Sequence, residues 1–315
     1  MVSREQNRIM QKEKRHAFTI KKREIPLHLM LLPAVIVVLI FSYIPMAGIV
    51  IAFQDFVPAK GLFGDQDWVG LNNFRLLMSL PNSKNVLTNT IIIAFWKIIL
   101  GLVVPIVVAL LLNELKSLKF KKMVQTVIYF PHFLSWIILS AVLIDILAPS
   151  TGIVGKMFQI LHMNPPFFLG DNSYFRGTMV VSDVWKNFGY GTIVYLATIT
   201  SIDPSLYEAA SIDGAGHFKQ IWHITLPGMR TIIVLMTVLS MGNVLNAGFD
   251  QIFNMYSPAV YETGDILDTL IYRMGLETSQ FGPAAAAGLF KSIISTIFIS
   301  VSYLVADKCF NYKLF

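Results

Sequence analysis

Residues 27–53 read LHLMLLPAVIVVLIFSYIPMAGIVIAF, a run without a single Asp, Glu, Lys or Arg. The hydrocarbon core of a bilayer is about 30 Å thick, and an α-helix of roughly 20 apolar residues crosses it. The run is long enough for that. It is too long for the apolar core of a signal peptide, and a small-residue cleavage site does not follow it. This stretch therefore predicts a membrane-spanning helix.

The chain as a whole is also rich in hydrophobic residues and poor in charged ones. Of its 315 residues, 55% are hydrophobic and 14% are charged. The charged share is roughly half that of a typical soluble domain. This composition argues against a water-soluble enzyme and favours an integral membrane protein. The single cysteine, Cys309, excludes a disulfide within the chain.

Six apolar stretches are long enough to cross a bilayer. They cover about 27–53, 86–112, 124–147, 178–199, 229–248 and 283–306. They predict an all-α transmembrane domain over 27–306, preceded by a basic segment at 1–26 and followed by a tail at 307–315. Pro33 and Pro105 inside the spans are tolerable, because neighbouring helices can satisfy the carbonyls that a proline frees.

The basic residues are distributed unevenly between the two sides of these spans. The two termini, the loops at 113–123 and 200–228, and Arg230 together carry 16 Lys and Arg residues, whereas the other three loops carry 6. By the positive-inside rule, both termini face the cytoplasm and the protein lies in the cell membrane. The net charge of +6 then reflects topology rather than nucleic-acid binding.

The cytoplasmic loop between the fourth and fifth spans is unusually rich in structure signals. With its flanks it reads SIDPSLYEAASIDGAGHFKQIWHITLPGMR (201–230). Pro204 predicts a helix start, and the run DGAG at 213–216 predicts a tight reversal. A second short helix is expected from His217, ending near Pro227. The loop is therefore predicted to be a helix-turn-helix at the membrane surface.

Nine residues of this loop fall at the spacing of the EAA motif. They are Glu208, Ala209, Ala210, Asp213, Gly214, Ala215, Ile224, Leu226 and Pro227. The loop thus resembles the cytoplasmic coupling loop of permeases in ATP-binding-cassette (ABC) importers, and the resemblance implies the type I importer fold. It extends over about 33–291, where runs such as WVGLNNF (68–74) and QTVIYFPHFLSW (125–136) look like the LplB/YteP-like branch of carbohydrate permeases.

This resemblance implies a set of partners. They are a second, homologous permease that completes a heterodimer, a dimer of ATPase subunits that bind ATP and Mg, an extracytoplasmic solute-binding lipoprotein, and an oligosaccharide substrate moved by alternating access. The chain has no Walker-type phosphate-binding loop of its own. We therefore expect it to be a transport subunit rather than an enzyme, with no catalytic residue, bound cofactor or metal.

A coupling helix that docks in a groove transmits force only if it is rigid and packed on one face. Contact area is expected from Tyr207, Ala209, Ala210 and Phe218. Glu208 offers a charge to a basic groove, and Gly214 sets the bend. The alternative is an amphipathic helix resting on lipid headgroups, which would carry more lysines than the one at 219.

Five ionisable residues remain within the predicted spans: Lys97, Asp145, Asp183, Lys186 and Lys291. Charge is costly inside a bilayer, so such residues are functional candidates. Asp183 and Lys186 lie one helical turn apart and are placed to pair. Lysines that line a cavity would suit an oligosaccharide with uronate carboxylates. The alternative is that they snorkel, or neutralise helix-end carbonyls and partner acids.

The fifth span carries amides in a repeating pattern. Asn243, Asn246 and Asp250 recur at three and four residues, which places them on one face of a helix. Amides and carboxylates bind sugar hydroxyls, and aromatic rings stack on the apolar faces of sugars. The alternative is that small and polar residues pack and bond the helices together. The predicted substrate path consists of Asn243, Asn246, Phe249, Asp250, Trp185, Tyr190, Lys97, Lys186 and Lys291.

Two expectations concern the outer side and the class of transporter. The loops at 54–85, 148–177 and the acidic 249–282 are expected to form the surface that meets the binding protein.

The competing function is an ion-gradient-driven secondary carrier or channel for small polar solutes. That class usually shows an internal inverted repeat, which this sequence does not display.

Overall fold

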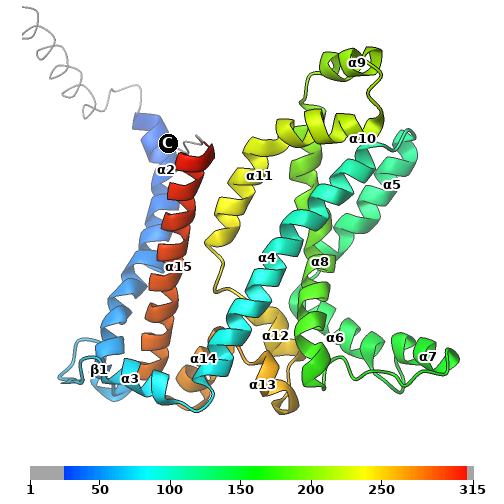
Figure 1. Cartoon of the computed structure of the whole chain (residues 1–315). Helices are drawn as coiled ribbons and strands as arrows, with labels where there is room; N and C mark the ends of the chain where they lie inside the picture. The colour runs from blue at the N-terminus through cyan, green and yellow to red at the C-terminus, as the bar shows by residue number, and fades with distance from the viewer. Residues whose placement is uncertain (1–24, 311–315) are drawn as a thin grey trace, which may run out of the picture. The chain divides into compact units, whose positions relative to one another are not determined.

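The computed structural model describes residues 25–310, and they are mostly helical (Figure 1). Within this range they fall into two compact units, which divide after Val50. The predicted basic segment at 1–26 lies almost wholly outside the described residues, as does the end of the predicted tail at 307–315.

The described part of the first unit is one run of helix that continues into the second unit. It consists of α2 (Ile25–Val38), a π-helical turn η1 (Leu39–Tyr43) and a 3-10 helix η2 (Ile44–Phe53). Pro45 explains the change of helix type, because a proline has no backbone N–H and its ring clashes with the preceding turn. The wider turn lets the N–H of Ile44 reach the carbonyl of Leu39 instead.

The second unit is built around two long helices that pack against each other, α4 (Ser83–Asn113) and α8 (Asn172–Thr200). Its main core gathers Ile93, Leu139, Phe175, Met179 and Ile252, each at most 1% exposed. Two further helices, α11 (Leu226–Met241) and α15 (Phe281–Phe310), pack against each other, and α11 also contacts α4 and α8.

Four helical runs are long and apolar enough to span a membrane. They are Ile25–Phe53, Ser83–Asn113, His217–Met241 and Phe281–Val305, and a bent pair of helices adds a fifth candidate. The fourth predicted span, 178–199, lies within α8, which has 29 residues. Polar side chains such as Asp183, Lys186 and Asn187 make this helix less apolar than the four runs above. Its composition alone therefore does not identify it as a membrane span. Six crossings with cytoplasmic termini stay a prediction.

The third predicted span, 124–147, is not one helix. The chain forms α5 (Leu118–Tyr129) and a short 3-10 turn η4 (Phe130–Phe133), and then turns by 105° into α6 (Trp136–Leu147). Pro131 opens the turn, and Ser135 adopts an extended backbone at the start of α6. The hydroxyl of Ser135 accepts a hydrogen bond from the N–H of Ile138 at 3.4 Å, which caps the new helix.

The fifth predicted span, 229–248, is also broken. Helix α11 ends at Met241, and α12 (Phe249–Met255) begins only after a non-helical stretch at 242–248. Gly248 has φ of +92°, a conformation that favours glycine. Asn243 and Asn246 are weak helix formers. The prediction that Asn243, Asn246 and Asp250 share one helical face is therefore wrong.

Short elements form much of the segments between the long helices. Strands β1 (Gln54–Asp55) and β2 (Asp67–Trp68) form an antiparallel hairpin around the 3-10 turn η3 (Pro58–Lys60), with Gln54 opposite Trp68. Two short helices follow, α3 (Asn72–Ser79) and, after α6, α7 (Ile153–Ile160). The Asn73 amide donates to the carbonyls of Ala52 and Gln54, at 3.0 Å each, and so ties α3 to the end of η2.

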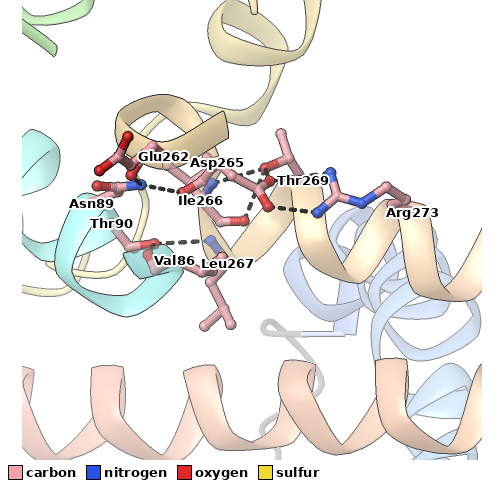
Figure 2. A network of polar contacts seen from close by, with 9 residues as sticks. All are labelled: Val86, Asn89, Thr90, Glu262, Asp265, Ile266, Leu267, Thr269 and Arg273. Carbon is pink, nitrogen blue, oxygen red and sulfur yellow. Dashed lines mark hydrogen bonds and ion pairs between the residues drawn. The ribbon is translucent and has the colours of Figure 1, made fainter. Parts of the chain in front are cut away.

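The segment at 249–282, which the sequence analysis places on the outer side, folds back onto α4 and α8. It contains α12, the 3-10 turn η6 (Pro258–Val260), α13 (Tyr261–Gly264), α14 (Leu267–Tyr272) and the π-helical turn η7 (Arg273–Glu277). Figure 2 shows the polar contacts that hold it. The Asn89 amide donates to the carbonyls of Asp265 (2.9 Å) and Glu262 (3.1 Å), and the N–H of Leu267 donates to the Thr90 hydroxyl (2.9 Å).

A buried ion pair lies at the centre of this network. Asp265 is 2% exposed, and its carboxylate accepts from Arg273 at 2.5 Å and from the Thr269 hydroxyl at 2.7 Å. Burial alone would lower the pKa of Arg273, but the hydrogen bond and charge of Asp265 raise it above its ordinary value. Asp268 also pairs within the chain, with Lys291. The acidic outer segment predicted from the sequence therefore presents fewer free carboxylates than its composition suggests.

We expect Asp265→Ala to lower the free energy of unfolding by about 3–5 kcal/mol, because it leaves the partly buried Arg273 without its partner. Thermal or denaturant unfolding of the purified protein in detergent measures this effect. Glu262→Gln is the matched control, since Glu262 enters the network through its backbone carbonyl and its side chain is exposed. Equal stability of the two variants would contradict the assignment.

Candidate functional site

The first arm of the predicted cytoplasmic loop is α9 (Pro204–Ile212). It begins at Pro204, as predicted. Asp203 caps it, because its carboxylate accepts a hydrogen bond from the N–H of Ser205 at 2.9 Å. This backbone N–H, together with the Ser205 hydroxyl, lowers the pKa of Asp203 below its ordinary value. The cap therefore stays ionised, and it fixes the start of the arm.

The reversal between the two arms lies where the sequence predicts it. Gly214 has φ of +76°, in the left-handed region that favours glycine. The N–H of Ala215 donates to the carbonyl of Ala210 at 2.8 Å, and the N–H of Gly214 donates to that of Ser211 at 3.1 Å. These bonds satisfy the last carbonyls of α9 in the manner of a Schellman motif.

The second arm does not end near Pro227, so that prediction is wrong. Helix α10 (His217–Gln220) passes through a π-helical turn, η5 (Ile221–Thr225), directly into α11, and Figure 1 shows the continuous helix. The π turn lets the N–H of Leu226 reach the carbonyl of Ile221. Pro227 follows this turn, and the change to π geometry accommodates a residue that has no N–H to donate and whose ring clashes with the preceding turn. The second arm is therefore continuous with α11.

Side chains bind the two arms to each other. The Tyr207 hydroxyl lies 3.0 Å from that of Thr225. The Gln220 amide donates to the Ser211 hydroxyl at 2.9 Å and to the carbonyl of Ala215 at 3.1 Å. These contacts connect α9 to the π turn and to the end of α10.

The outer face of this loop is apolar and exposed. Ile212 is 87% exposed, Phe218 78% and Trp222 61%. Among the residues predicted to contact a partner, Ala209 and Phe218 are exposed, whereas Tyr207 and Ala210 are half-buried within the loop. Sequence reasoning missed Ile212, although an apolar residue directly before the DGA run is the signal that marks it.

The loop rests on the end of α4. His217 Nδ1 lies 3.5 Å from Glu114 Oε2, at the residue that caps α4. A groove of about 310 Å³ runs between this end of α4 and the loop, lined by Glu114, Tyr207, His217 and Gln220 among others. Of the later motif residues, Ile224 and Leu226 are half-buried and Pro227 is exposed.

A polar cavity of about 490 Å³ opens where α11 breaks, between α4 and α8. Its polar lining residues are Lys97, Asp183, Asn187, Ser240, Asn243 and Asn246. The structure thus brings together three of the predicted path residues, Lys97, Asn243 and Asn246. It adds Asn187 and Ser240, which the sequence did not single out, and Asp183, which was expected only to pair with Lys186.

That expected pairing of Asp183 with Lys186 is wrong. Asp183 lies 3.5 Å from Lys97, whereas Lys186 donates to the carbonyl of His132 at 2.7 Å and lies 5.6 Å from the Trp136 ring centre. These contacts arise from other helices, and sequence spacing within α8 does not reveal them. Lys291 pairs with Asp268 at 2.5 Å. All three predicted path lysines therefore have partners within the chain.

The remaining predicted path residues do not join this cavity. Trp185 lines a separate pocket of about 430 Å³ beside α6, and Tyr190 stacks on the His132 ring with centres 4.2 Å apart. Phe249 lines another cavity, of about 660 Å³, together with Tyr272. Asp250 is exposed on α12. The predicted path is thus divided among several surfaces, and the polar cavity holds its amide portion.

Comparison with known proteins places these features in context. The family described as binding-protein-dependent transport system inner membrane component matches residues 101–310. The polygalacturonan/rhamnogalacturonan transport system permease protein YteP of Bacillus subtilis is 39% identical over 301 residues, covering 95% of this chain and 94% of YteP. Protein LplB of the same organism is 38% identical over 287 residues, covering 91% of this chain and 90% of LplB.

Solved structures agree with these relatives. A chain in the crystal structure of a bacterial ABC transporter involved in the import of the acidic polysaccharide alginate superposes with a TM-score of 0.84. It shares 36% sequence identity, and the match covers 91% of this chain and 96% of that one. A second structure, of the alginate ABC transporter in complex with an alginate pentasaccharide-bound periplasmic protein, matches equally well, with a TM-score of 0.84 and 35% identity.

The break that forms the cavity depends on Gly248, and this dependence can be tested. A Cβ at Gly248 would lie 2.8 Å from the Lys97 ammonium, and its φ is positive. We expect Gly248→Ala to lower the thermal stability of the purified protein by several degrees, because the backbone is strained and the ammonium must move. Gly101→Ala is the control, since Gly101 lines the same cavity and its Cβ would meet nothing within 4 Å. A similar loss in both variants would show that the break does not require glycine.

Proposed function

Because the chain belongs to the binding-protein-dependent transport system inner membrane components, as a sugar permease of an ABC transporter, we propose that it carries oligosaccharides across the cell membrane by alternating access. Uronate-containing oligosaccharides are among the proposed substrates. The polar cavity at the break of α11 is the structural observation that carries this proposal. Membership in this family favours an ATP-driven importer over the ion-gradient carrier considered from the sequence.

The cavity has the chemistry that sugar hydroxyls require. Asn187, Asn243 and Asn246 each offer an amide that donates and accepts, and Asp183 and Ser240 add further acceptors. Such groups match hydroxyls that are donors and acceptors at once. The uronate proposal draws on the relatives, whose names refer to polygalacturonan and alginate. Because Lys97 and Lys291 pair with carboxylates and Lys186 donates to the carbonyl of His132, we assign carboxylate recognition to amide N–H groups or to the second permease.

The proposal includes the partners of an ABC importer. They are a second permease in a heterodimer, an ATPase dimer that binds ATP and Mg, and an extracytoplasmic solute-binding lipoprotein. The residues proposed to couple the chain to the ATPase are those of the EAA motif: Glu208, Ala209, Ala210, Asp213, Gly214, Ala215, Ile224, Leu226 and Pro227. Exposed Ile212 and Phe218 supply apolar contact area on the same loop. We also propose that this loop and both termini lie in the cytoplasm.

We expect Glu208→Lys to reduce sugar-stimulated ATP hydrolysis by the purified complex at least tenfold. Glu208 is exposed on α9, and reversal of its charge would repel a basic docking groove. Glu208→Asp is the control, because it keeps the negative charge at the same position of α9. Sugar binding by the isolated binding protein should not change. Normal coupling in the Glu208 variant would contradict the proposed role of the loop.

We also expect the double variant Asn243→Ala and Asn246→Ala to raise the KM of oligosaccharide uptake at least tenfold, since each lost amide removes hydrogen bonds to sugar hydroxyls. Uptake into proteoliposomes that contain the whole complex is the measurement. Asn254→Ala serves as the control, because the Asn254 amide bonds to the carbonyl of Asp250 within α12. Unchanged uptake of neutral and acidic oligosaccharides in the double variant would place the path elsewhere.

A further inference from the structure

The break between α11 and α12 leaves backbone groups without helical partners in the interior of the protein, and Lys97 of α4 meets one of them. Its ammonium donates to the carbonyl of Ala247 at 2.6 Å. It also donates to Gln251 Oε1 in the first turn of α12, and it lies 3.5 Å from Asp183 on α8. Ala247 and Gln251 are fully buried, and Lys97 is 8% exposed.

Gln251 extends this contact to α8. Its amide donates to the carbonyl of Met179 at 2.9 Å and to the Ser182 hydroxyl at 2.8 Å. The ammonium has three protons, and it faces three acceptors that come from three different parts of the chain. Lys97 and Gln251 together therefore fasten the start of α12 to both α4 and α8.

The ammonium also occupies space that the break itself provides. A Cβ at Gly248 would lie 2.8 Å from Lys97 Nζ. The left-handed backbone at Gly248 thus serves two purposes, since it turns the chain and leaves room for the cation. Asn243 and Asn246 belong to the same non-helical stretch and line the cavity beside Lys97. Their orientation consequently depends on a backbone that Lys97 holds.

We propose that Lys97 is a positioning residue, whose ammonium fixes the shape of residues 242–248 so that Asn243 and Asn246 face the cavity. It does not itself recognise the sugar. This inference rests on the proposed function, because it assigns a role in the same cavity. It differs from the prediction made from the sequence, in which Lys97 contacts the substrate and attracts uronate carboxylates.

Transport kinetics of the whole complex in proteoliposomes separate the two roles. We expect Lys97→Met to raise the KM of a neutral oligosaccharide and of a uronate oligosaccharide by the same factor, at least tenfold. Lys97→Arg, which keeps the cation and its donors, should restore KM to within threefold of the wild type. An increase at least tenfold larger for the uronate substrate would overturn the proposal, since it would show direct contact with the carboxylate.

Thiol labelling tests the positioning role without reference to the substrate. In a Cys309→Ser background, Asn246→Cys reports the exposure of the break to a water-soluble thiol reagent. We expect Lys97→Met to change the labelling rate at least fivefold, and Lys186→Met, which alters a lysine bonded to His132, to leave it unchanged. An unchanged rate in the Lys97 variant overturns the proposal.

If the Lys97→Met variant does not assemble into the complex, a third variant tests the proposal. Lys97→Gln removes the charge but keeps one donor for the carbonyl of Ala247, and the same labelling criterion applies to it. If the wild-type complex transports neither class of oligosaccharide, the proposed function fails, while the labelling result still decides whether Lys97 positions the break.

Discussion

Backbone polar groups inside a membrane protein must find partners within the protein, because hydrocarbon offers none. This constraint accounts for three places where the helices of this chain depart from α-helical geometry. A π turn at Leu39–Tyr43 precedes Pro45, the Ser135 hydroxyl caps the helix that follows the 105° bend, and the Lys97 ammonium takes the carbonyl of Ala247 where α11 breaks. The third solution is the costliest, since it buries a cation, and it forms the wall of the polar cavity.

The helical run that ends in α11 joins the polar cavity to the EAA loop. From His217 to Met241 the chain is helical for 25 residues, which corresponds to roughly 37 Å at ~1.5 Å per residue. One end contacts α9 through Thr225 and Gln220, and the other end, Met241, lies two residues before Asn243. The π turn at Ile221–Thr225 keeps the chain helical up to the proline of the motif, so that α10 continues into α11. A continuous helical segment therefore connects the side chains that contact α9 to the residues that precede the cavity.

The sequence predicts those features that depend on local chemistry, and it misses those that depend on distant partners. Long apolar runs predicted the helices at 27–53, 86–112 and 283–306, and glycine chemistry predicted the turn at Gly214. The break at 242–248 was missed, because the contact that stabilises it comes from Lys97, 150 residues away from Ala247. The contacts of Asp183 and Lys186 were missed for the same reason, because their partners lie on other helices. Neighbours on a helix gain only about 0.2–0.5 kcal/mol from pairing, so that buried partners on other helices determine where each charge lies.

The pairing of the lysines also bears on how a transporter must bind its substrate. A translocation site has to bind favourably enough for entry and weakly enough for release. An unpaired cation in a cavity of low dielectric would hold a uronate carboxylate strongly and slow its departure. The Lys97–Asp183 pair leaves the cavity near electrical neutrality, with amides as its main polar groups. Amides bind hydroxyls and carboxylates alike with moderate strength, so that a neutral cavity can pass both neutral and acidic saccharide units without trapping either.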